Sequence, residues 1–129
     1  MRLLEDHPFF QLDGLYGSQV SSGTKLSIGK EGRVLEIHKS DAEEITKKKF
    51  DFIFSAVSEQ TATSLERELR SMNNRIVTNA SGNRVLPDVP IVVLEVNYQE
   101  ISGLDKRGYI VANGNCSTIG LVLGLAPLR

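Results

Sequence analysis

Hydrophobic residues along the chain gather in short runs, which alternate with polar turns and with amphipathic segments. Continuous apolar runs rich in β-branched and aromatic residues are typical of buried strands, and looser alternation is typical of half-buried ones. This pattern predicts six strands, at residues 10–16, 33–37, 50–57, 75–78, 91–94 and 109–112.

Helical periodicity lies between several of these strands. A helix is predicted from Ser58 or Glu59 to Met72, because Leu65 and Leu69 share one face. Its other face should be mostly charged, with Glu66, Arg67, Glu68 and Arg70. Briefer helical pieces are predicted at 41–46 and 98–104, and a short, mostly buried apolar helix from Ser117 onward.

Apolar strands that alternate with helices predict an α/β domain with a mostly parallel, doubly wound sheet. In such sheets ligands collect at the carboxyl ends of the strands. Polar and reactive residues lie at or just past the predicted strand ends: Ser18, Ser55, Asn79, Arg84 and Cys116.

Cys116 is the single cysteine, and it lies where the last predicted strand turns into a helix. Unpaired backbone N–H groups and the helix dipole stabilise a thiolate at such a position, and the thiolate is the nucleophile. The alternative is a small buried apolar residue, which is the commoner role of a lone cysteine. Spacing alone leaves both open.

A loop rich in serine and glycine follows the first predicted strand, from Gly17 to Lys25. Its hydroxyl groups, backbone N–H groups and lysine suit a phosphate. On composition alone a solvated turn is the better interpretation.

Composition limits the number of domains, the partners and the compartment that we expect for this chain. The 129 residues, with 40% hydrophobic and 24% charged residues and a net charge of −1, predict one soluble domain over residues 1–129. We expect no nucleic-acid or membrane partner, since the longest like-charge block is Lys47–Lys49 and no apolar run could span a bilayer. One cysteine permits no internal disulfide, which agrees with a reducing, cytoplasmic location. No residues near His38 have metal-ligand spacing.

Five motifs occur in order: Phe54-Ser-Ala56, Thr78-Asn-Ala-Ser81 with Arg84, Pro87-Asp-Val-Pro90, Glu95-Val-Asn97 and Asn115-Cys-Ser-Thr118. Together they resemble the nucleotide-binding domain of aspartate-semialdehyde dehydrogenase, in its archaeal and fungal branch. The resemblance implies a Rossmann-like fold and the NADPH-dependent reductive dephosphorylation of aspartyl phosphate to aspartate semialdehyde, within lysine, methionine and threonine biosynthesis. It also implies a homo-oligomeric full-length enzyme.

The resemblance also assigns roles. Cys116 would attack the acyl phosphate and form an acyl-thioester, Asn115 would help to orient the substrate carbonyl, and Arg84 would hold the phosphate or carboxylate. The first fifty residues match the family only by pattern, and there Ser18, Ser21, Ser22 and Lys25 would face the adenosine 2′-phosphate of NADP. Ser55 and Asn79 would line the cofactor.

Some features depart from the family. Gly114 and Leu94 stand where the family usually has proline, and Gly114 is expected to loosen the turn that aims Cys116. The glycine-rich first strand and turn, and the base and substrate residues of the catalytic domain, are expected to lie outside these residues. We therefore expect no turnover from this chain alone. The alternatives are a malonyl-CoA reductase, a non-catalytic remnant and, less favoured, an N-acetyl-glutamyl-phosphate reductase.

Overall fold

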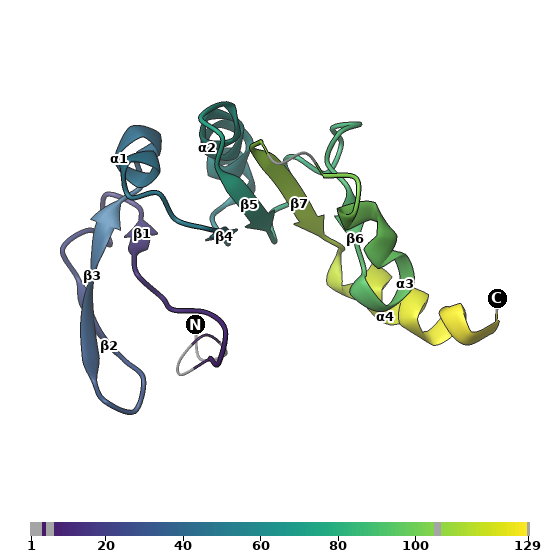
Figure 1. Cartoon of the computed structure of the whole chain (residues 1–129), viewed down its shortest axis with the longest axis horizontal. Coiled ribbons are helices and arrows are strands. Elements are labelled where there is room, and N and C mark those ends of the chain that lie inside the picture. The colour runs from purple at the N-terminus through teal and green to yellow at the C-terminus, as the bar shows by residue number, and fades with distance from the viewer. Residues whose placement is uncertain (1–3, 5–6, 105–106, 129) are drawn as a thin grey trace. The chain divides into compact units, whose positions relative to one another are not determined.

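Two separate β-sheets carry the fold (Figure 1). The computed structural model describes residues 4, 7–104 and 107–128. Its contacts divide the chain into two compact units, residues 1–44 and 45–129.

The N-terminal unit contains a three-stranded sheet in the order β1-β3-β2. Its strands are β1 (Leu15–Gly17), β2 (Lys25–Ile28) and β3 (Arg33–Lys39), and helix α1 (Ala42–Lys47) begins at its end. Strand β1 is parallel to β3, whereas β2 is antiparallel to it. Strand β2 was not predicted from the sequence, and its hairpin turn to β3 uses Gly29 and Gly32, both with positive φ.

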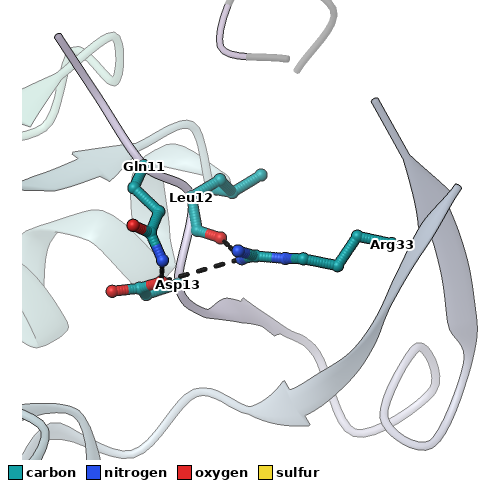
Figure 2. A network of polar contacts seen from close by, with 4 residues as sticks. All are labelled: Gln11, Leu12, Asp13 and Arg33. Carbon is teal, nitrogen blue, oxygen red and sulfur yellow. Dashed lines mark hydrogen bonds and ion pairs between the residues drawn. The ribbon is translucent and has the colours of Figure 1, made fainter. Parts of the chain in front are cut away.

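A polar cluster ties the segment before β1 to the start of β3 (Figure 2). The Arg33 guanidinium donates to the backbone oxygen of Leu12 and lies 3.7 Å from the Asp13 carboxylate. Asp13 also accepts a hydrogen bond from the Gln11 amide at 2.8 Å. These contacts hold the entry to β1 against the strand that it pairs with.

The C-terminal unit is built on a four-stranded, fully parallel sheet in the order β4-β5-β7-β6. Its strands are β4 (Ile53–Ser55), β5 (Arg75–Thr78), β6 (Ile91–Val92) and β7 (Tyr109–Asn113). Its helices are α2 (Glu59–Ser71), α3 (Leu94–Asn97), α4 (Cys116–Leu125) and the 3₁₀ turns η1 (Tyr98–Ile101) and η2 (Ala126–Leu128). The mostly parallel α/β prediction is therefore confirmed.

Helix α2 packs on the two central strands, β5 and β7. Ala62 and Leu69 of the helix and Ile76, Ile110 and Ala112 of the strands are all nearly or fully inaccessible to solvent. Glu66 lies on this same face and is only 1% exposed, so its predicted place on the polar face was wrong. Glu66 is buried because it lies four residues after Ala62 and three before Leu69, which places all three on one face of the helix.

Two segments are less buried than their apolar composition predicted. The run 50–57 forms a strand only at β4, and Phe54 is 51% exposed because β4 is an edge of its sheet. Helix α4 has no buried residue, and Leu121, Leu123 and Leu125 are exposed. A helix that is apolar on every side is typical of one that packs against several neighbours. Among the described helices, none is long and apolar enough to cross a membrane.

Candidate active site

The carboxyl ends of three neighbouring strands meet at one edge of the C-terminal sheet. Ser55 pairs with Thr78, and Thr78 pairs with Ala112, so β4, β5 and β7 end almost in line. Ser55 ends β4, Asn79 and Arg84 lie in the loop after β5, and Cys116 begins the helix that follows β7. The structure therefore brings these four predicted residues to one edge of the sheet.

Cys116 is the first residue of α4 and is exposed. The N-cap residue is Asn115, whose side-chain Oδ1 accepts a hydrogen bond from the Ser117 N–H at 3.0 Å. An Asn cap of this kind fixes the first turn of a helix and satisfies one of its free N–H groups. The sulfur is thus held at the positive end of α4, open to solvent, and the buried apolar interpretation does not fit this position.

Arg84 connects the loop after β5 to the turn that precedes Cys116. Its Nη2 donates to the backbone oxygen of Asn79 at 3.1 Å and to that of Gly114 at 3.5 Å. Its Nε is buried and has no hydrogen-bond partner among the described residues. Arg84 therefore has one N–H donor without a partner and contacts Gly114, two positions before Cys116. A guanidinium so placed suits an anionic group.

Asn79 is fixed on both sides. Its N–H donates to the backbone oxygen of Ser55 at 2.9 Å, and its Oδ1 accepts from the Asn113 amide at 3.1 Å. Asn113 was not among the residues predicted from the sequence, although its place at the end of β7 could have marked it. The ends of β4, β5 and β7 are thereby joined by hydrogen bonds.

Gly114, in the turn before Cys116, is buried. A Cβ built on it would lie 2.9 Å from Cγ1 of Ile119 and 3.6 Å from Cγ2 of Val93. The backbone of the turn is therefore packed closely between α4 and the end of β6. The expectation that glycine leaves Cys116 poorly aimed finds no support in this packing.

The predicted serine-rich loop belongs to the N-terminal unit. It forms a tight turn in which the N–H groups of Ser21 and Ser22 both donate to the Ser18 backbone oxygen at 3.1 Å. The Ser21 hydroxyl also donates to that oxygen, so it serves the turn itself. Ser18 and Ser22 are exposed, and Lys25 is the exposed first residue of β2, paired in register with Glu36.

Two displaced pKa values lie outside this site. Partial burial, aided by the Glu44 carboxylate, raises the pKa of Tyr16 above 10.0. A hydrogen bond from Arg70 lowers the pKa of Asp88 below 3.8. Within the described residues, no group of three or more His, Cys, Asp or Glu is placed to hold a metal ion.

Comparison with known proteins supplies the family. Residues 1–104 match the family model described as "Semialdehyde dehydrogenase, NAD binding domain". The chain is 29% identical to the aspartate-semialdehyde dehydrogenase of Archaeoglobus fulgidus, covering 99% of this chain and 41% of that protein. It is 32% identical to the enzyme of the same name from Schizosaccharomyces pombe, covering 98% of this chain and 40% of that protein.

A solved structure supports the same family assignment. The crystal structure of Candida albicans aspartate-semialdehyde dehydrogenase with NADP superposes with a TM-score of 0.84 at 28% identity, covering 98% of this chain and 41% of that one. The chain thus spans about two fifths of the length of the relatives that it matches. The family model matches about four fifths of this chain, and the fold is Rossmann-like, so the chain belongs to the semialdehyde dehydrogenase family and matches its NAD-binding domain.

Proposed function

We propose that this chain is the nucleotide-binding part of an NADP-dependent aspartate-semialdehyde dehydrogenase, in which Cys116 is the nucleophile. One observation carries the proposal: an exposed cysteine begins α4, while the Arg84 guanidinium contacts the backbone of the same turn. The names of the aligned relatives and of the NADP-bound structural neighbour support the substrate and the cofactor.

The chain's own residues suggest how an acyl phosphate would react. The Cys116 thiolate attacks the acyl carbon, the carbon–oxygen bond to phosphate breaks, and phosphate leaves with that electron pair, so that an acyl-thioester remains. N–H groups in the first turn of α4 stabilise the developing oxyanion. Arg84 holds the phosphate or the substrate carboxylate. Asn115, already engaged as the cap, orients the reacting turn more than the substrate.

In the N-terminal unit, exposed hydrogen-bond donors would bind a phosphate of NADP. The hydroxyl groups of Ser18 and Ser22 and the Lys25 ammonium are open to solvent and suit a phosphate, whereas the Ser21 hydroxyl shapes their turn. Ser55 and Asn79, at the carboxyl ends of β4 and β5, would line the cofactor. When bound, NADPH supplies the hydride that reduces the thioester to the aldehyde.

We expect no turnover from the 129 residues alone. A general base is needed to complete the reaction, and residues 45–129 contain no histidine. His7 and His38 both belong to the N-terminal unit. The full-length enzyme, which we expect to be a homo-oligomer, would supply the base. Phosphate-dependent NADP reduction with aspartate semialdehyde measures this directly, and clear activity would show the inference about the base to be wrong.

Alkylation by iodoacetamide at neutral pH tests the nucleophile. We expect iodoacetamide to alkylate Cys116 rapidly, because its sulfur is exposed at the first residue of α4. Inorganic phosphate should slow the reaction in the wild type. Arg84→Gln should raise the half-protecting phosphate concentration about tenfold or more, the effect of losing a charged hydrogen bond.

Arg70→Gln is the matched control. It removes the same charge, but Arg70 lies in the last turn of α2 and pairs with Asp88. A rate equal to that of free cysteine, with no phosphate protection, would point to a non-catalytic remnant. Protection by coenzyme A in place of phosphate would favour the malonyl-CoA reductase alternative.

A further inference from the structure

A buried carboxylate lies beneath the loop that carries Asn79 and Arg84. Glu66 extends from α2 toward the end of β5 and is 1% exposed. Its Oε1 accepts a hydrogen bond from the Thr78 hydroxyl at 2.6 Å, and its Oε2 accepts one from the Asn83 amide at 2.9 Å. Thr78 precedes the loop and Asn83 is near its end, so one side chain holds both ends.

Both partners of Glu66 have their orientation fixed by other contacts. The Thr78 hydroxyl oxygen accepts from the Ala80 N–H at 3.0 Å, which bends the chain directly after β5. The Asn83 Nδ2 also donates to the Ala62 backbone oxygen at 3.1 Å, and its Oδ1 accepts from Arg67 Nε at 2.8 Å. An Asn83 amide flip would oppose donor to donor at Arg67 and acceptor to acceptor at Ala62. Asn83 therefore presents only a donor to Glu66.

The same loop presents its polar groups to the candidate site. Asn79 follows Thr78 directly, and Arg84 follows Asn83 directly. The Arg84 N–H donates to the Ser81 backbone oxygen at 3.0 Å, and its Nη2 reaches back to the Asn79 oxygen. Displacement of either end of the loop moves the guanidinium relative to the turn at Gly114.

We propose that Glu66 is a positioning residue, which sets the place of Arg84, and with it anion binding, through Thr78 and Asn83. A carboxylate suits this role because it accepts from two donors at once, whereas an amide of the same shape offers one acceptor and one donor. In Glu66→Gln the oxygen would face Asn83, which cannot turn. The new NH₂ group would then face Thr78, whose hydroxyl would lose its acceptor. The proposal rests on the function given above for Arg84 and Cys116.

The full 129-residue chain allows a test that separates position from reactivity. The rate of Cys116 alkylation without phosphate reports the environment of the sulfur, and the half-protecting phosphate concentration reports the arginine. Glu66→Gln should raise that concentration about tenfold, because a small displacement of a positioned charge weakens binding strongly, while the rate without phosphate stays near that of the wild type. Thr78→Val, which removes one arm of the contact, should act in the same direction.

Glu68→Gln is the matched control, since Glu68 is exposed on the same helix. It should leave both quantities unchanged. If Glu66→Gln and Thr78→Val fold and have the same half-protecting phosphate concentration as Glu68→Gln, the proposal is wrong. Equal changes in reactivity and protection would also overturn it, because they would indicate a general loss of structure. If phosphate fails to protect even the wild type, the proposed function is wrong and this inference falls with it.

Discussion

Thr78→Val is the sharpest test of the buried polar network, because the two side chains have nearly the same shape. The wild-type hydroxyl is fully buried, donates to Glu66 at 2.6 Å and accepts from the Ala80 N–H at 3.0 Å. Valine fills the same space but leaves a carboxylate oxygen and a backbone N–H without partners. The substitution thus isolates the two hydrogen bonds from packing.

The expected cost follows from these two groups. A buried polar group left unpaired costs about 1–3 kcal/mol, with more for a charged one, and the added apolar methyl recovers about 0.8 kcal/mol. We therefore expect Thr78→Val to lower the free energy of unfolding by about 3 kcal/mol. With a urea slope of about 1.5 kcal/mol/M, the midpoint should fall by about 2 M.

Far-UV circular dichroism in urea measures the effect, with Thr78→Ser as the control. Serine keeps the hydroxyl and loses one methyl group, which costs about 1 kcal/mol. If valine destabilises the chain no more than serine does, the hydroxyl contributes nothing beyond its volume. The account of a network that spans α2 and the loop after β5 would then be refuted.

Three other predictions concern the cysteine turn, helix α4 and the Arg70–Asp88 pair. Gly114→Ala should lower the free energy of unfolding in urea by about 1–3 kcal/mol, because its Cβ would meet Ile119. Gly124→Ala, with open space around it, should stabilise α4 by about 0.5–1 kcal/mol. Equal effects of the two substitutions would contradict the packing described for Gly114. Asn115→Ala should cost about 1 kcal/mol by removing the cap of α4, and Asn115→Asp should restore most of it; no loss would show that the cap is not needed. Arg70 lowers the folded-state pKa of Asp88, so NMR should show this carboxyl titrating below 3.8. The stability that Asp88 contributes is present above that pH and is lost as the pH falls through the folded-state pKa. Arg70→Gln should return the titration to its ordinary range, and an unchanged midpoint would rule out Arg70 as the cause.

Local pattern predicted much of the C-terminal unit. Apolar periodicity predicted strand β7, the start of α4 and the bounds of α2 to within one residue. The carboxyl-end rule placed five residues at strand ends, and four of them, Ser55, Asn79, Arg84 and Cys116, lie at one edge of the C-terminal sheet, whereas Ser18 belongs to the N-terminal unit. These inferences succeed because each depends on residues close in sequence or on a general property of parallel sheets.

Long-range pairing explains what the pattern missed. The alternation in β2 is only four residues long and lies between glycines, so only its antiparallel partner β3 makes it a strand. Apolar residues in α4 and around Phe54 indicate a tendency toward burial, but exposure depends on what lies beside them. Glu66 was misplaced because charge outweighed periodicity in that prediction, although its spacing from Ala62 and Leu69 carried the correct answer.

The double contact of Arg84 with the backbone has a consequence for the thermodynamics of binding. Free arginine side chains lose roughly 2 kcal/mol of rotamer entropy when they are immobilised, and here the carbonyl groups of Asn79 and Gly114 already restrict the side chain during folding. An incoming anion would therefore meet a nearly rigid receptor. Its association should carry a small entropic penalty, and calorimetry would show affinity dominated by a favourable enthalpy.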